Sequence, residues 1–173
     1  MKANLIAELI NNFNVYKSGK RIGVDGEVEL PELEALTETV SGAGVLGEME
    51  LPATGHFGST VTKIKFAILH DDYFSLLDTT KAQELTLRAD GQYSDPDTGD
   101  VEDLLVKIIV RGRAKTATLG TFEKGKKSEA ELELETFYLK VEIDGTVELE
   151  LDKLNTKYVV KGKDILAKIR RNI

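Results

Sequence analysis

Residues 129–152, EAELELETFYLKVEIDGTVELELD, alternate apolar and polar side chains along almost their whole length. Successive side chains of a β-strand point to opposite faces, so the pattern predicts two strands that each have one apolar and one polar face. The alternation changes phase once, at Glu135-Thr136, which predicts a bulge or a bend that carries the strand from one environment into another. The apolar positions are Ala130, Leu132, Leu134, Phe137, Leu139, Val141, Ile143, Val147, Leu149 and Leu151.

Asp144-Gly145 marks the turn between these two strands. A two-residue loop would place Val141 opposite Glu148 and mix the two faces. We therefore expect a three-residue loop from Ile143 to Gly145, with Gly145 in the left-handed position of a bulge. The predicted pairs are Val141 with Val147, Leu139 with Leu149, Phe137 with Leu151, Lys140 with Glu148 and Tyr138 with Glu150.

The composition favours one soluble domain over residues 1–173. A hydrophobic content of 41% in 173 residues is enough for one buried core and short for two. The 30 acidic and 23 basic residues give a net charge of −7, which argues against a general nucleic-acid-binding surface. Disulfides and thiolate metal sites are excluded because the chain has no cysteine. No stretch resembles a secretion signal or a membrane span, so we expect a protein made in the cytoplasm.

The N-terminal third predicts short, irregular elements. Helical spacing of apolar residues over 5–13 indicates a short helix or a packing arm, although Asn11, Asn12 and Asn14 oppose a long helix. Ser18-Gly19 predicts a tight hairpin, and Pro31 predicts an edge or bent strand over 28–36. Residues 41–60 contain five glycines, which predicts a long loop or an irregular extended hairpin.

The remaining chain predicts more strands and two short helices. Strands are expected over 62–69, 84–89 and 104–110, with a turn over 95–100 and a solvated loop over 124–127. Asp71 or Asp72 is predicted to cap a central helix, and Asp164 is predicted to cap a final one. Ile165, Leu166, Ile169 and Ile173 form an apolar stripe on that final helix, with basic residues near its C-terminus.

Three sequence patterns could form a binding or catalytic site, but each also has a simpler structural interpretation. Residues 42–47 match GxGxxG, but Pro52 blocks the helix that a dinucleotide site needs, so we expect a flexible or interface loop. The aspartates at 95, 97 and 100 could hold calcium, yet Asp-Pro-Asp-Thr-Gly is good turn chemistry by itself. His56 and His70 lack metal-ligand spacing and are expected to be structural or surface residues. Glutamate is too abundant for a glycosidase pair to stand out.

The chain resembles the major tail tube proteins of contractile-tailed bacteriophages and of related contractile bacteriocin particles. The order and spacing of several short motifs carry the resemblance across nearly all of the 173 residues. These motifs are Asn14-Val15-Tyr16 with the following glycine turn, Leu30-Pro31-Glu32-Leu33, Ser41-Gly42-Ala43-Gly44, Asp97-Thr98-Gly99, Val110-Arg111-Gly112-Arg113, and the closing run from Tyr138-Leu139-Lys140 through Asp144-Gly145 to Arg170-Arg171-Asn172-Ile173.

The resemblance implies a mainly β (α+β) fold of tail-tube type, an antiparallel β-barrel or sandwich with one short flanking helix and a short C-terminal helix. It also implies that six copies close into a ring and that rings stack into a tube inside a contractile sheath. The implied partners are further copies of the chain, sheath and baseplate proteins, and DNA as cargo that is not specifically bound. No enzyme activity, cofactor, metal or membrane contact is expected. The implied location is a virion tail or a tailocin particle, assembled in the bacterial cytoplasm.

Three sets of residues are assigned within that arrangement. A ring-stacking loop comprises Gly42, Ala43, Gly44, Val45 and Gly47. The proposed lumen-lining residues are Glu131, Glu133, Glu148 and Glu150, because polar strand faces line such tubes. The C-terminal contact comprises Ile165, Ile169, Arg170, Arg171 and Ile173.

Two other function classes remain open at the level of sequence. One is the ring-forming tube protein of type VI secretion, which shares the architecture, although the Gly-Ala-Gly loop and the Arg-Gly-Arg run favour the tail family. The other is a free β-sandwich that binds carbohydrate or protein. Only 6% of residues are aromatic and there is no tryptophan, which is thin for a sugar-binding platform.

Overall fold

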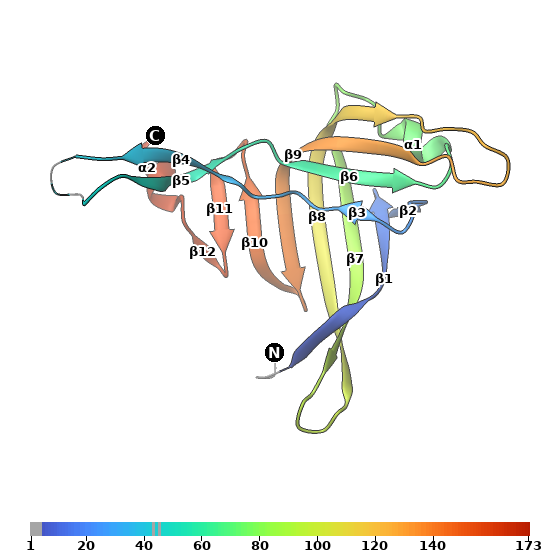
Figure 1. Cartoon of the computed structure of the whole chain (residues 1–173), viewed down its shortest axis with the longest axis horizontal. Helices are drawn as coiled ribbons and strands as arrows, with labels where there is room; N and C mark the ends of the chain where they lie inside the picture. The colour runs from blue at the N-terminus through green and yellow to red at the C-terminus, as the bar shows by residue number, and fades with distance from the viewer. Residues whose placement is uncertain (1–4, 43, 45) are drawn as a thin grey trace.

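The computed structural model describes residues 5–42, 44 and 46–173, and it is mainly β with antiparallel strand pairing (Figure 1). The strands of the first half are β1 (Ile6–Lys17), β2 (Lys20–Ile22), β3 (Val28–Glu29), β4 (Ala35–Val40), β5 (Met49–Phe57), β6 (Val61–Phe66) and β7 (Gln83–Ser94). Those of the second half are β8 (Val101–Thr118), β9 (Ala130–Ile143), β10 (Thr146–Asp152), β11 (Lys157–Val160) and β12 (Lys163–Asp164). The helices are α1 (Asp71–Ser75) and α2 (Ala167–Asn172).

Strand β9 bends at the predicted change of phase. Its first half, up to Glu135, pairs with β6, and its second half, from Tyr138 onward, pairs with β10. Along β8, Arg111 pairs with Tyr138 and the next residue, Gly112, pairs with Thr136, so Phe137 is the extra residue of a bulge. The bulge and the bend are therefore both confirmed, and β9 takes part in two layers of the fold (Figure 1).

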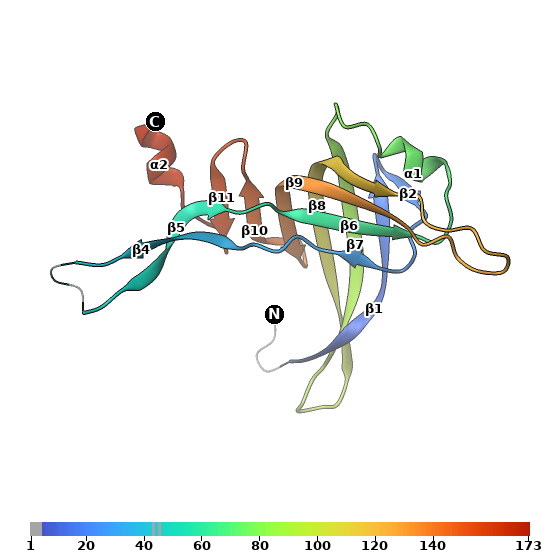
Figure 2. The same ribbon diagram turned by 45° about the horizontal axis from the view of Figure 1, so that its top comes forward.

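The two layers form a sandwich. The larger layer has the strand order β12-β11-β10-β9-β8-β7-β1-β2. The smaller layer, β3 and β6 with the first half of β9, crosses the larger one (Figures 1 and 2). Strands that change layer through bends and bulges are typical of such crossed packing. Over the described residues the sheet ends at β12 and β2, so this fold is an open sandwich and the barrel alternative is not found.

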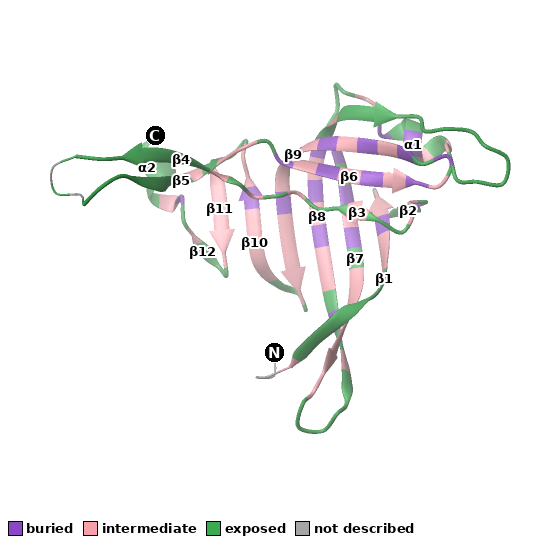
Figure 3. Cartoon of the chain, in the orientation of Figure 1, coloured by how far each residue is buried: buried purple, intermediate pink, exposed green. Residues whose placement is uncertain are grey.

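The core lies between the layers and takes buried apolar residues mainly from β6, β7, β8, β9 and β10, together with Val15 of β1 and Ile22 of β2 (Figure 3). Because β9 supplies both layers, its alternating leucines reach this one core from two directions. The fully buried members of the core are Val15, Ile64, Phe66, Tyr73, Leu76, Leu85, Val110, Ala130, Leu132 and Leu134.

The β9–β10 turn differs from the prediction. Asp144 and Gly145 form a two-residue turn with φ of 46° and 78°, and Ile143 pairs directly with Thr146. Two left-handed residues give the twist that antiparallel strands favour, so the predicted three-residue loop is wrong. The strand pairing then skips Glu148 in a bulge, and this returns Leu149 and Leu151 to the apolar face.

The bulge at Glu148 also replaces the predicted cross-strand pairs. The observed pairs are Val141 with Leu149, Leu139 with Leu151, Lys140 with Glu150 and Tyr138 with Asp152. Each predicted partner is two residues away from the observed one, so Leu149 and Leu151 keep the predicted face while their partners change. Val147, before the bulge, pairs with Glu142 and so lies on the polar face and not on the predicted apolar one. Tyr138 still contacts Glu150, because its hydroxyl donates a hydrogen bond of 3.3 Å to that carboxylate.

The N-terminal segment is a strand and not the short helix that its spacing suggested. β1 pairs with β7 along its whole length, with bulges at Glu8 and Asn11. Each bulge inserts one residue into the two-residue period of the strand, and this shifts the apolar positions towards helical spacing. The hairpin at Ser18-Gly19 is confirmed.

Both helix caps differ from the predictions. His70, and not Asp71 or Asp72, is the N-cap of α1: its Nδ1 accepts a hydrogen bond of 3.2 Å from the backbone of Asp72. Leu166 occupies the N-cap position of α2 without a side-chain bond. Asp164 instead accepts a hydrogen bond of 3.1 Å from the backbone N–H of Leu166, which fixes the turn before the helix.

Glu135 braces the bend of β9. Its carboxylate accepts hydrogen bonds from the Ser59 hydroxyl at 2.6 Å and from the Lys115 ammonium at 3.1 Å. Burial acts to raise the pKa of Glu135, but the bonds from Ser59, Lys115 and the Thr60 backbone outweigh it, so the pKa lies below its usual value of 4.5. The brace therefore contributes stability above that pH and loses it as the pH falls through the lowered pKa.

We expect the Glu135→Gln variant to be less stable than the parent chain at pH 7 and to approach it at pH 3. The amide cannot reproduce the ionic bond, whereas at low pH the parent carboxylate also loses its charge. Thermal unfolding of both chains from pH 7 to pH 3 measures the gap. Parallel curves would show that the brace makes no contribution that depends on pH.

Candidate assembly surfaces

The β4–β5 hairpin is largely exposed to solvent. It forms its own two-stranded sheet and extends away from the sandwich in both views (Figures 1 and 2). The prediction for residues 41–60 is thus confirmed as an extended hairpin, although Met49–Phe57 is a strand and not a loop. Its exposed apolar residues are Leu36, Val40, Leu46, Met49 and Leu51.

The predicted ring-stacking loop lies at the tip of this hairpin. Gly42, Gly44 and Gly47 have positive φ values of 139°, 93° and 100°, and no other atom lies close to where their side chains would project. Ala43 and Val45 lie outside the described residues. The tip is therefore shaped by backbone conformations that favour glycine and is not constrained by contacts within the described chain.

The base of the hairpin is fixed against the C-terminal segment, a contact that the sequence did not reveal. Gly55 has φ +76°, and a Cβ there would lie 2.5 Å from a methyl carbon of Leu166. The Phe57 ring meets the Tyr158 ring with centroids 5.0 Å apart. Lys153 donates a hydrogen bond of 2.6 Å to the Gly58 carbonyl. The hairpin and the C-terminus, predicted as separate surfaces, are therefore structurally coupled.

We expect Gly55→Ala to destabilise the chain by about 2–3 kcal/mol, since a positive φ costs an L-residue about 1–2 kcal/mol and the new methyl group also displaces Leu166. Gly99→Ala is the matched control, because Gly99 has the same φ of +76° with nothing within 4 Å of its Cβ position. Urea unfolding measures both variants. Equal losses would mean that the contact with Leu166 adds nothing.

The C-terminal residues assigned to a contact are exposed in the single chain. Ile165, Ile169 and Ile173 have exposed fractions of 37%, 42% and 89%. Arg170 is held within the chain, since it pairs with Asp164 at 2.5 Å and donates to the Thr156 carbonyl at 3.1 Å. Arg171 is exposed. Of the predicted stripe only Ile169 lies within α2, because the helix spans Ala167–Asn172. A helix of six residues is unstable alone, so these exposed isoleucines favour a further partner.

Glu131 and Glu133 lie on the smaller layer, on the side away from the core. They pair across the ladder with Lys65 and Lys63 of β6. Hydrogen bonding to Glu29 is the main cause that raises the pKa of Lys63, and the charges of Glu131 and Glu133 add to it. This polar face therefore mixes carboxylates and ammonium groups and is not a row of glutamates alone.

Glu148 and Glu150 lie on the larger layer, on strand β10 and away from the core residues Leu149 and Leu151. Glu150 pairs with Lys157 at 2.8 Å, and Glu148 is the bulged residue. Because the core lies between the two layers, the bend in β9 places the two predicted glutamate pairs on opposite outer faces. The structure thus groups Glu131 with Glu133 and Glu148 with Glu150, but it does not join all four.

The larger layer ends in two unlike edges. At one end, β12 is two residues long, and at the other β2 covers only the Val15–Lys17 part of β1. The remainder of β1 carries exposed Ile6, Leu9 and Ile10, at 55%, 56% and 65%. Exposed strand edges tend to pair with other chains.

Other chemistry receives little support from the geometry. Asp95 accepts hydrogen bonds from the backbone of Asp97 and Gly99, so hydrogen bonds within the aspartate turn stabilise it without a bound cation. In the described ranges no group of three or more His, Cys, Asp or Glu residues could hold a metal ion. The GxGxxG match belongs to the hairpin tip and precedes a strand, which a dinucleotide site does not allow. Across those same ranges, every helix is too short or too polar to cross a bilayer.

The described residues form an open β-sandwich with unlike edges and an exposed projecting hairpin, and such surfaces are typical of chains that assemble with other chains. The comparisons with known proteins identify the family. Residues 7–173 match the family described as phage tail tube protein FII, and the chain belongs to this family. It is also 28% identical, over 162 residues, to the tail tube protein of Escherichia phage P2, a match that covers 92% of this chain and 93% of that protein.

Membership of the family implies a structural protein that assembles with itself into the tube of a virion tail. The resemblance drawn from the sequence motifs is thereby confirmed at the level of a phage tail tube protein.

Proposed function

We propose that six copies of this chain close into a ring and that rings stack into the inner tube of a contractile tail. Such a tube would conduct DNA or form the penetrating tube of a headless bacteriocin. Family membership over residues 7–173 is the observation that carries the proposal. The unlike edges of the larger layer support it, because a contact between two different surfaces repeats around a ring.

The hairpin supports stacking between rings. It extends from the body, carries exposed apolar residues, and ends in the glycine-rich tip at Gly42, Gly44 and Gly47. We propose that this tip contacts the next ring together with Ala43 and Val45, while the stripe Ile165, Ile169 and Ile173 contacts a neighbour near the hairpin base. Sheath and baseplate proteins are the proposed outer and terminal partners.

The larger layer is the better candidate for the lumen wall. This layer has an open edge at each end of an eight-strand path, so copies joined at those edges, directly or through an added strand, would give a continuous inner wall. Its outer face would then line the channel, with Glu148 and Glu150 on it, and Glu131 and Glu133 would lie on the outer wall. A water-filled lumen tolerates such charges and keeps a polyanion from adhering.

Charge reversal distinguishes the two faces. We expect Glu148→Lys with Glu150→Lys to leave the chain folded but to make assembled tubes retain a short fluorescent DNA, because reversed charges attract phosphate groups. Glu131→Lys with Glu133→Lys is the matched control on the other face. Retention measured by sedimentation should rise only for the first pair, and a rise only for the second would place the smaller layer at the lumen.

Two alternatives are separated by assembly. A type VI secretion tube protein would also form rings, although the family match favours the phage tail. A free β-sandwich binding module would remain a monomer of 19.1 kDa. Size-exclusion chromatography with light scattering tests the proposal: rings should have six times the mass of the chain, and a monomer at every concentration would favour the binding module.

A further inference from the structure

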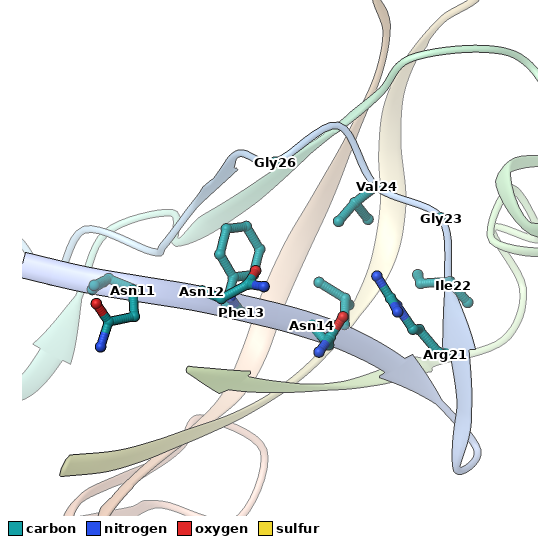
Figure 4. A pocket seen from close by; sticks show the side chains of 11 residues that line it. Asn11, Asn12, Phe13, Asn14, Arg21, Ile22, Gly23, Val24 and Gly26 are labelled. Carbon is teal, nitrogen blue, oxygen red and sulfur yellow. The ribbon is translucent and has the colours of Figure 1, made fainter. Parts of the chain in front are cut away.

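A hollow of about 480 Å³ lies beside the open edge of β1 (Figure 4). The described ladder between β2 and β1 stops at Val15, so the outer edge of β1 from Ile6 to Asn14 has no strand beside it within the described residues. In Figure 4, Phe13 and Val24 project into the space between β1 and the segment that follows β2. An edge of this kind can accept an added strand.

Side chains hold this edge in a strand conformation before any partner arrives. At the first bulge, Glu8 accepts hydrogen bonds from Gln92 at 2.5 Å and from the Ser94 hydroxyl. At the second, Asn11 donates a hydrogen bond of 2.9 Å to Asp90. Both bulged residues are thus tied to β7. An edge that is already ordered costs less entropy when it binds another strand.

The β4–β5 hairpin is a candidate for the strand that pairs with this edge. It is not paired with the main sheet, and an isolated two-stranded hairpin is marginally stable in water. Its exposed Leu36, Val40 and Met49 match the exposed Ile6, Leu9 and Ile10 of β1 in character. Contact between the hairpin and β1 would remove both groups of exposed apolar side chains from water.

Strand β4 is the half of the hairpin that is available for pairing. The base of β5 is fixed by Gly55 against Leu166 and by Phe57 against Tyr158. Among the described residues, β4 (Ala35–Val40) pairs with β5 alone, so its other edge is open. Strand β4 can therefore add to a sheet without displacing the C-terminal segment.

One charge beside the open edge of β1 is complementary to the hairpin. Residues 35–57 contain Glu38, Glu48 and Glu50 and no lysine or arginine. Arg21 lines the hollow and is exposed, and none of the ion pairs among the described residues includes it. An acidic hairpin arriving at β1 would bring carboxylates to this guanidinium, a pairing that guides both encounter and register.

We propose that strand β4 of one copy adds to the outer edge of β1 of a second copy and lies along the hollow at Phe13, Arg21 and Val24. This inference rests on the proposed self-assembly and names the two surfaces that meet. The hairpin lies at one end of the long axis, and β2 with the adjoining part of β1 lies towards the other (Figure 1). A contact between opposite ends joins two unlike surfaces and can propagate from copy to copy.

Disulfide crosslinking tests the proposal cleanly, because the full chain has no cysteine. Asn12→Cys copies are mixed with Thr37→Cys or Thr39→Cys copies that carry a tag of different mass, assembled and oxidised. Lys124→Cys, on the loop before β9, replaces Asn12→Cys as the matched control. We expect at least one hairpin position to give about tenfold more heterodimer with Asn12→Cys than with the control, because a disulfide needs Cα atoms within about 7 Å.

Negative-stain microscopy of the same samples distinguishes a failure of the proposed β4–β1 pairing from a failure of the proposed function. Rings or tubes with heterodimer yields no higher than the control would overturn the pairing of β4 with β1 and leave the proposed function standing. A parent chain that forms neither rings nor tubes would contradict the proposed function and this inference with it.

Discussion

Gly112→Ala is expected to destabilise the chain by about 3 kcal/mol or more, because the new methyl group has no room at the bend of β9. Gly112 is buried on β8 opposite the bulge of β9. A Cβ there would lie 2.5 Å from the Glu135 carbonyl oxygen and 3.2 Å from the Thr136 Cα. These neighbours are backbone atoms of the bend itself, so they can yield only if β8 and β9 move apart at the bulge.

Gly91→Ala is the matched control for this substitution. Gly91 is also a buried strand glycine without positive φ, but the nearest atoms to its Cβ position are 3.5 Å away or more. A methyl group should fit there and, by restricting the unfolded chain, should stabilise it by up to about 1 kcal/mol. Urea unfolding of both variants gives the comparison. A loss at Gly112 no larger than at Gly91 would mean that the bend does not depend on this close approach.

Gly44→Val is expected to abolish tube formation while it leaves the single chain folded. Gly44 has φ +93°, a conformation that a β-branched residue adopts poorly, and its Cβ would meet nothing within 4 Å. The substitution should therefore reshape the hairpin tip without loss of core packing. We expect the free energy of unfolding of the monomer to fall by no more than about 1–2 kcal/mol, the cost of a positive φ for an L-residue, because the tip makes no contact with the core.

Tube yield, measured by pelleting and negative-stain microscopy, reports the effect on assembly. In the proposed ring several copies of the hairpin act together, so a contact weakened by about 1.4 kcal/mol per copy, a factor of ten each, should stop stacking. Gly125→Val is the control, because Gly125 has φ +82° in an exposed loop that no proposed interface includes. Normal tubes from Gly44→Val would remove the tip from the stacking contact.

The sequence predicted the strands and the bend of β9 because both depend on local alternation. The register of β10 could not be predicted in the same way. A bulge at Glu148 and a three-residue loop at Asp144-Gly145 both keep the leucines on one face, and only the twist preference of the turn decides between them. The alternation of apolar and polar residues therefore predicts the face on which these leucines lie, but it does not predict their cross-strand partners.

Two features could not be predicted from local sequence patterns: the strand conformation of β1 and the contact between the hairpin base and the C-terminal segment. Two bulges in β1 turned a strand period into apparent helical spacing, and pairing with β7 over its length outweighed that local signal. The contact between Gly55 and Leu166 joins segments far apart in the chain, and a glycine in a loop-like stretch gives no sign of what approaches it. The assembly surfaces are proposed from the resemblance, whereas the contact between the hairpin base and the C-terminal segment became visible only in the fold.

Electron cryomicroscopy of assemblies formed by the concentrated full chain tests the central claim most directly. The account predicts hollow tubes of stacked six-subunit rings, with hairpins bridging between copies and the outer face of the β7–β11 layer lining an open channel. Monomers at every concentration, or assemblies without an axial channel, would contradict the assignment of this chain as a tail tube subunit.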